Sequence, residues 1–136
     1  MRDVSINELM VAASESARGA GGVTREFFGR ASAYDTKSRD IDIVTEADKA
    51  SERWLDAFFL RKYPDHGFVG EEGSHRPSRS GVTWVVDPLD GTTNFAHGIP
   101  TFGVSVAAFR DGQVVAGAVC DPMRDELFVA GLWQGA

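Results

Sequence analysis

Cysteine is nearly absent from this chain of 136 residues, which contains only one, Cys120. A single cysteine excludes an intrachain disulfide and a cysteine-rich metal site. No apolar run approaches the length of a membrane span, roughly 18–20 residues, or of a signal-peptide core, roughly 7–15 residues. We therefore expect a soluble protein that stays in the reducing cytoplasm and does not act in a membrane.

Positive charge is also scarce. The chain has 14 Lys and Arg residues against 20 Asp and Glu residues, a net charge of −6. A phosphate backbone would be repelled by this balance, so nucleic acid is an unfavoured partner. An acidic protein that acts on a small anion needs a local source of positive charge, and a bound divalent cation is the most direct one.

The apolar content of 43% is that of an ordinary globular protein, and the length suits a single domain spanning residues 1–136. Apolar residues at helical spacing predict helices over residues 6–28 and 45–63, the second after a capping signal, T-E-A-D. Alternation of Ile and Asp over residues 34–44 predicts a half-exposed strand. The first helix has three glycines that could interrupt it: Gly19, Gly21 and Gly22.

The second half of the chain is typical of a sheet. Apolar and β-branched runs predict strands at residues 67–70, 83–86, 103–109, 114–120 and 126–130. Asp111 and Gly112 predict a tight hairpin turn between the third and fourth of these. The polar, basic stretch 73–81 is expected to be an exposed mobile loop or a plain linker.

The sequence D-P-L-D-G-T-T-N-F, residues 87–95, follows a buried strand directly. Asp87 and Asp90 can face one point, and paired carboxylates suit a hard cation such as Mg²⁺. The residues from Gly91 onward can begin a helix whose N–H groups face a phosphate. Taken alone, the same pattern fits an Asx turn with a helix cap.

Two further acidic residues, Glu71 and Glu72, stand at the end of a short apolar strand. Carboxylates gathered without a cation raise one another's pKa and repel. We therefore expect these residues to join the aspartates around a metal, with Glu72 either supporting the ligands or remaining a loop carboxylate.

Three motifs in this order resemble the inositol monophosphatase family: V-T-E-A-D at residues 44–48, G-E-E at 70–72 and D-P-L-D-G-T-T-N-F at 87–95. The likeness covers essentially the whole chain. It implies an α+β fold, a layered sandwich of helices and antiparallel sheet, of which this chain is the N-terminal portion without the C-terminal layers.

The resemblance also implies a site with two or three Mg²⁺ ions, or Mn²⁺ in their place. Glu71, Asp87 and the backbone carbonyl of Leu89 would hold the first ion, and Asp87 and Asp90 the second. Glu71 and Thr92 would activate the attacking water, with Asp48 supporting Thr92.

The phosphate of the substrate would lie against the residues that follow the metal ligands. The resemblance implies contacts from Lys37, Asp90, Gly91, Thr92 and Thr93. For the remaining reactive side chains, structural roles are preferred over catalytic or metal-binding ones. Cys120 is expected to be a buried structural thiol, His66 and His97 structural hydrogen-bonding groups, and His75 a solvated loop residue.

The family's downstream motif, W-D-x-A-A-G, has no match in this sequence. We therefore expect an incomplete second metal site, and rank an incomplete sequence above a truncated gene product and a deliberately cut fragment. The leading function is hydrolysis of a small phosphate monoester, with inositol monophosphate as the first expected substrate. Fructose 1,6-bisphosphate, histidinol phosphate and 3′-phosphoadenosine phosphate are alternative substrates. A catalytically incomplete binding or regulatory module is the alternative function. The resemblance further implies a homodimer and inhibition by lithium.

Overall fold

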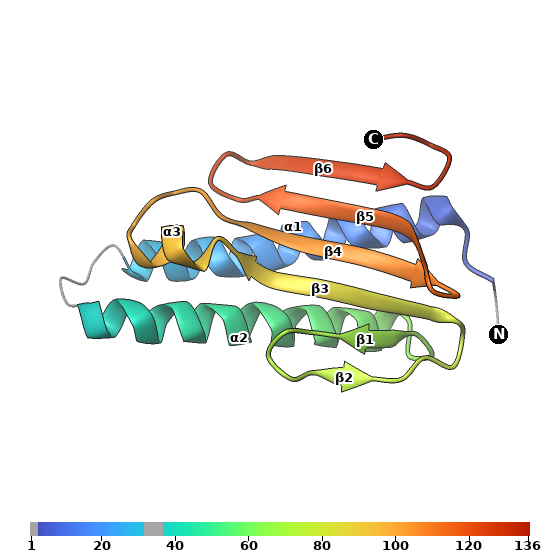
Figure 1. Cartoon of the computed structure of the whole chain (residues 1–136), viewed down its shortest axis with the longest axis horizontal. Coiled ribbons are helices and arrows are strands. Elements are labelled where there is room, and N and C mark those ends of the chain that lie inside the picture. The colour runs from blue at the N-terminus through green and yellow to red at the C-terminus, as the bar shows by residue number, and fades with distance from the viewer. Residues whose placement is uncertain (1–2, 32–36) are drawn as a thin grey trace.

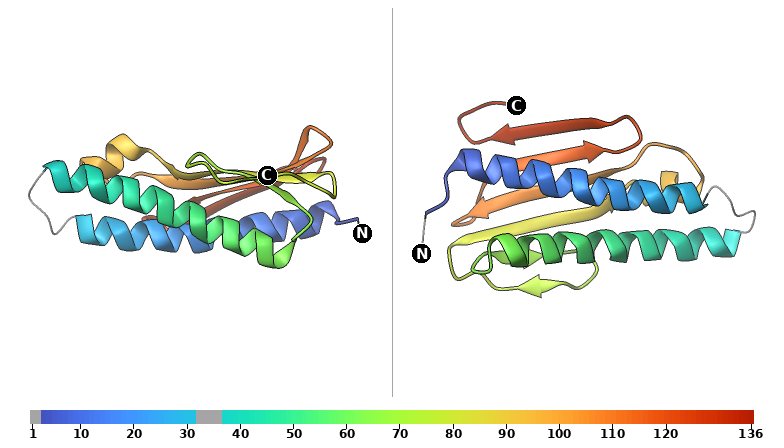
Figure 2. Two further views of the ribbon diagram at one scale, coloured as in Figure 1. Left: turned by 90° about the horizontal axis from the view of Figure 1, so that it is seen from below. Right: turned by 180° about the vertical axis from the view of Figure 1, so that it is seen from behind.

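The computed structural model describes residues 3–31 and 37–136, and within the helices it leaves the side chains of residue 31 and residues 37–42 undescribed. Two long helices, α1 (Ile6–Ala31) and α2 (Lys37–Lys62), lie side by side on one face of a six-stranded sheet (Figures 1 and 2). Neither helix, over its described residues, is long and apolar enough to cross a membrane.

The sheet has the strand order β2-β1-β3-β4-β5-β6. Its strands are β1 (Gly67–Val69), β2 (His75–Arg76), β3 (Val82–Asp90), β4 (Gly103–Arg110), β5 (Gln113–Asp121) and β6 (Glu126–Gly131). Neighbours pair antiparallel except β1 and β3, which run parallel. The expected layered α+β fold is confirmed, with a mixed sheet in place of a purely antiparallel one.

Strand alternation buries one face of the sheet under the helices. On β3, Val82, Trp84 and Val86 are buried, whereas Val85 between them is 37% exposed. The inward side chains form one apolar core with residues of α1 and α2, among them Leu9 and Phe59. The predicted hairpin is confirmed, and its turn residue Asp111 has the positive φ that the sequence D-G favours.

The first predicted helix is confirmed and begins where expected, since Ser5 Oγ accepts the N–H of Glu8 at 3.1 Å. The glycines do not interrupt it. A Cβ on Gly19 would lie 2.0 Å from the ring of Trp54, and one on Gly21 would lie 2.8 Å from Cys120 Sγ. These glycines let α2 and the sheet approach the helix closely.

The strand predicted over residues 34–44 is wrong from Lys37 onward, because α2 begins there; residues 34–36 lie outside the described residues. Ile43 and Ala47, four residues apart, face the same side of the helix and are both buried in a second, smaller core. That packing favours a helix over a strand. Thr45 consequently lies inside the helix and does not cap it.

Two further boundaries differ from the prediction. Strand β3 continues through Asp90 with an irregular register after Asp87, because β4 keeps pairing with it beyond Val86. Stretch 73–81 is not simply an exposed loop: it contains β2, and Arg76 forms a partly buried ion pair with Asp56 of α2.

Candidate functional site

The parallel pairing of β1 and β3 brings the two predicted acidic motifs together. Val69 lies opposite Val85 in the register. Glu71 and Asp87 each follow two residues later, so the two residues lie beside each other just past the last β1–β3 pair. Their carboxyl groups are hydrogen-bonded to each other, which raises the pKa of Glu71 and lowers that of Asp87.

The pKa of both carboxyl groups is raised overall, that of Asp87 despite this hydrogen bond. Burial is the largest cause for each. The charge of Asp87 then raises the pKa of Glu71, and the charge of Asp90 raises the pKa of Asp87. Asp90 itself is exposed at the end of β3. The predicted ligands therefore repel one another, as expected for carboxylates gathered without a cation.

Asp48 lies beneath this pair, on the buried side of α2. It is 9% exposed, and its Oδ1 atom has no hydrogen-bond partner among the described residues. Burial, followed by the charges of Glu72, Asp87 and Glu71, raises its pKa to about 7. The expected support of Thr92 is therefore not made through Oδ1 in this structure.

The irregular end of β3 from Asp87 to Asp90, called the Asp87 turn, is anchored at both its polar and its apolar groups. The N–H of Leu89 donates to Asp87 Oδ1 at 3.3 Å, and Ser51 Oγ donates to the carbonyl of Pro88 at 2.7 Å. The Leu89 side chain is buried in the second core, whose other members are Phe28, Ile43, Ala47, Phe95 and Phe102. The backbone of the turn is thereby fixed against α2.

Gly91 links the turn to the short helix α3 (Thr92–Ala96). Its φ of 91° is in the left-handed region that favours glycine, and a Cβ there would lie 3.2 Å from the carbonyl of Thr101. Thr92 and Thr93 are exposed in the first turn of α3. The predicted phosphate-contacting residues thus follow the carboxylates directly, while the side chain of Lys37 lies outside the described part.

The donor set fits a hard divalent cation. Its atoms are carboxylate and carbonyl oxygens, which Mg²⁺ prefers. The raised pKa values and the unpartnered Oδ1 of buried Asp48 show negative charge without a compensating cation. Among the side chains that the structure describes, no three from His, Cys, Asp or Glu are grouped closely enough to hold a metal ion.

The structural roles expected for His66 and Cys120 are confirmed. His66 is buried and accepts a hydrogen bond from Trp84 Nε1 at its Nδ1, at 2.9 Å, and burial lowers its pKa to about 4. Cys120 is a free, buried thiol whose pKa is raised by burial. His97 lies 2.7 Å from the carbonyl of Thr93 through its Nδ1, and His75 is exposed.

Sequence reasoning missed two buried polar residues of α2, Ser51 and Glu52. The Ser51 hydroxyl donates a hydrogen bond to the carbonyl of Pro88, and the Glu52 carboxylate accepts the N–H groups of Glu72 and Ser74. A signal was present in the sequence, because these residues stand three and four positions after Asp48 and so share its helix face.

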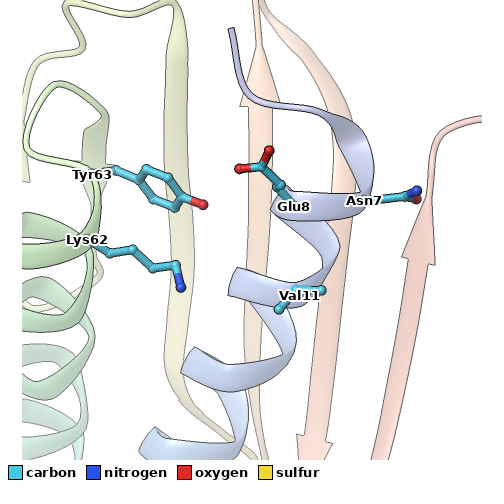
Figure 3. Close-up of a pocket in the computed structure, with 5 residues that line it drawn as sticks. All are labelled: Asn7, Glu8, Val11, Lys62 and Tyr63. Atoms are coloured by element: carbon cyan, nitrogen blue, oxygen red, sulfur yellow. The ribbon is translucent and has the colours of Figure 1, made fainter. Parts of the chain in front are cut away.

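A separate hollow of about 460 Å³ lies at the other end of the helix pair (Figure 3). Its lining residues are Asn7, Glu8, Val11, Lys62 and Tyr63. Lys62 is 14 residues beyond Asp48, about 20 Å along the helix axis at 1.5 Å per residue. The hollow therefore takes no part in the carboxylate site.

Comparisons with known proteins show the family to which the chain is similar. The profile of the inositol monophosphatase family matches residues 5–136. A histidinol-phosphatase from Chlorobaculum parvum is 40% identical over 124 residues, 91% of this chain and 48% of its own length. Nus factor SuhB from Pasteurella multocida is 41% identical over 133 residues, 96% of this chain and 50% of its own length.

A solved structure of inositol monophosphatase from Anabaena has the same fold, with a TM-score of 0.80 at 32% identity. The likeness covers 97% of this chain and 47% of that one. The chain spans about half the length of the curated relatives it matches. Because the family profile matches from residue 5 to the last residue and the fold agrees with a solved member, the chain belongs to the inositol monophosphatase family.

Proposed function

We propose that this chain carries the divalent-cation site of a phosphatase that hydrolyses a small phosphate monoester. One observation carries the proposal: the parallel register of β1 and β3 sets Glu71 beside Asp87, above the buried Asp48. Carboxylates with raised pKa values on two adjacent strands, next to a glycine that begins a helix, are typical of a catalytic site.

Glu71, Asp87, Asp90 and the carbonyl of Leu89 would hold Mg²⁺. When bound, Mg²⁺ supplies positive charge to the phosphate and lowers the pKa of a water ligand. Glu71 is exposed and its pKa is raised, so its carboxylate is suited to accept the proton of the attacking water. Thr92 would orient that water through its hydroxyl group.

The residues after Asp90 would bind the phosphate. The amides around Gly91, Thr92 and Thr93 can donate to its oxygens, and Lys37 would add a positive charge. The leaving group is an alcohol, since a monoester releases inorganic phosphate and the parent hydroxyl compound.

We propose inositol monophosphate as the first substrate and histidinol phosphate as the second. The names of relatives favour both, because one is a histidinol-phosphatase and a solved neighbour is an inositol monophosphatase. Fructose 1,6-bisphosphate and 3′-phosphoadenosine phosphate have no such support among the relatives described above.

A second candidate function is a binding or regulatory module. The observation that favours it is the outer face of the sheet, where Phe128 is 60% exposed and Val119 is 45% exposed. Apolar side chains exposed together on one face are typical of a surface that contacts another protein.

The two candidates are separated by phosphate release. The 136-residue chain is assayed with inositol 1-phosphate and with histidinol phosphate, with and without Mg²⁺, beside Asp90→Asn. Asp90 is exposed, so this variant keeps the fold. Release that requires Mg²⁺ and falls at least about a hundredfold in the variant supports the phosphatase. Equal release by both proteins contradicts it, and release by neither favours the binding module for this chain.

A further inference from the structure

Glu52 is a carboxylate buried inside the helix–sheet interface. It is 1% exposed, and its two oxygens accept backbone N–H groups: Oε1 from Glu72 at 2.8 Å and Oε2 from Ser74 at 3.1 Å. A buried carboxylate is costly unless hydrogen bonds satisfy it. Here both oxygens are satisfied by one loop, the loop that carries Glu71.

Gly70 leaves the room for this contact. A Cβ at Gly70 would lie 2.2 Å from Glu52 Oε1 and 2.3 Å from its Cδ atom. The N–H of Gly70 also donates to the carbonyl of Ser74 at 2.9 Å, which closes the loop on itself. The loop from Gly70 to Ser74 is therefore a tight turn built around the Glu52 carboxylate.

The preceding residue of α2 holds the other ligand-bearing segment. Ser51 Oγ donates to the carbonyl of Pro88 at 2.7 Å, in the turn between Asp87 and Asp90. Adjacent positions of one helix thus fix both segments. Since a helix is rigid over two residues, the spacing between the two loops is set by α2 itself.

We infer that Glu52 is a positioning residue, which fixes Glu71 relative to Asp87 through the amides of Glu72 and Ser74 and thereby sets the affinity of the site for Mg²⁺. The inference rests on the proposed function, because it takes Glu71 and Asp87 as ligands. Glu52 does not need to touch the cation, the water or the substrate.

Two variants perturb the same contact from opposite sides. Glu52→Gln keeps the shape of the side chain but replaces one acceptor oxygen with an amide donor, which cannot accept an N–H. Gly70→Ala keeps the Glu52 charge but pushes the carboxylate away from the amides. Glu46→Gln is the matched control, since it removes one carboxylate from an exposed position of the same helix.

Hydrogen exchange of the Glu72 and Ser74 amides is measured in the 136-residue chain without Mg²⁺, and Mg²⁺ affinity is measured by calorimetry. We expect exchange at both amides to accelerate at least about tenfold in Glu52→Gln and Gly70→Ala, and affinity to fall about 10- to 100-fold, the range for residues that support metal ligands. Glu46→Gln is expected to resemble the unmodified chain in both measurements.

Three results would overturn the inference: unchanged exchange in both variants, unchanged affinity despite faster exchange, or weaker affinity in Glu52→Gln alone, which would assign the effect to charge. Because the two variants act independently, either one that folds is sufficient for the exchange measurement. Failure of the proposed function shows separately, as absence of Mg²⁺ binding by the unmodified chain.

Discussion

Asp48 is buried among carboxylates whose charges oppose its ionisation. Its pKa of about 7 is caused first by burial and then by the charges of Glu72, Asp87 and Glu71. Without a cation this is a destabilising arrangement, which a neutral side chain relieves.

Asp48→Asn is therefore expected to raise the free energy of unfolding by about 1–2 kcal/mol at pH 8 without Mg²⁺, because it removes a buried charge. Urea unfolding measures the change, and Glu46→Gln, on the exposed face of α2, is expected to change it little. The increase in the free energy of unfolding should be smaller when saturating Mg²⁺ is added. A variant less stable than the unmodified chain at pH 8 would contradict the account of this cluster.

Neutral His66 makes the folded chain less stable as the pH falls, whereas the raised pKa of Asp48 makes it less stable as the pH rises. Its pKa falls from 6.5 to about 4 in the folded chain, so the unfolded chain binds the proton more tightly. The stability that neutral His66 contributes is fully present above pH 6.5 and is lost as the pH falls from 6.5 towards 4. At about 1.4 kcal/mol per pKa unit, this group alone costs about 2.5 kcal/mol at pH 4.5.

His66→Asn isolates this effect, because asparagine keeps an acceptor for Trp84 Nε1 but does not titrate. We expect the loss of unfolding free energy between pH 7 and pH 4.5 to be about 2 kcal/mol smaller in the variant than in the unmodified chain. Urea unfolding at the two pH values measures it. Equal losses would show that His66 is not the group responsible.

For single residues, the sequence predicted that Glu71 and Asp87 lie together but not how buried each side chain is. Glu71 and Asp87 were found because their motifs are local. Glu52 was missed because its partners are backbone amides of Glu72 and Ser74, 20 and 22 residues away. A hydrogen bond to a backbone N–H depends on tertiary geometry, and because nearly every residue type supplies that N–H, the sequence does not reveal the partner.

The helices and strands were predicted where periodicity is strong. The second half of the chain, from β3 to β6, agrees with the predicted strands within a few residues. The error over residues 34–44 arose because alternation of Ile and Asp fits period two, while Ile43 and Ala47 also fit the four-residue spacing of a helix. Tertiary packing against the second core decides between them, and a local pattern does not include that packing.

The close approach of α1 and α2 gives a prediction for Gly19. Alanine favours a helix over glycine by about 1 kcal/mol, but a Cβ at Gly19 would lie 2.0 Å from the Trp54 ring. We expect Gly19→Ala to lower the free energy of unfolding by about 2 kcal/mol, because overpacking outweighs propensity. Chemical denaturation measures the change.

Gly22→Ala is the matched control on the same helix. A Cβ there meets no described atom within 4 Å, so this variant should gain up to about 1 kcal/mol from helix propensity. Adding Trp54→Leu to Gly19→Ala should recover part of the loss by removing the ring. If Gly19→Ala stabilises the chain as Gly22→Ala does, the two helices are not in the contact described.

For the molecule as a whole, both long helices cover the same face of the sheet (Figure 2). Among the described residues the outer face is left with exposed apolar side chains. Phe128 on β6 lies opposite Val119 on β5, at 60% and 45% exposure, and Val85 on β3 is 37% exposed. Such a face favours association with another protein surface.

We therefore expect the 136-residue chain to self-associate with rising concentration, and Phe128→Lys to weaken this association. Sedimentation velocity measures the association. Because Phe128 is exposed, the substitution should change the free energy of unfolding by no more than about 0.5 kcal/mol. Trp133→Ser is the control, since Trp133 is 90% exposed but lies beyond β6. A larger effect from Trp133→Ser than from Phe128→Lys would move the contact away from the sheet face.

Calorimetric titration of Mg²⁺ into the 136-residue chain, beside Asp87→Asn, measures whether the carboxylates that β1 and β3 bring together form a Mg²⁺ site. Buffers of different ionisation enthalpy report the protons released. We expect binding with proton release, because a cation beside Asp48, whose pKa is raised to about 7, favours its ionised form, and we expect a loss of at least about tenfold in affinity in the variant. Equal binding by both proteins, or binding by neither, would contradict this expectation.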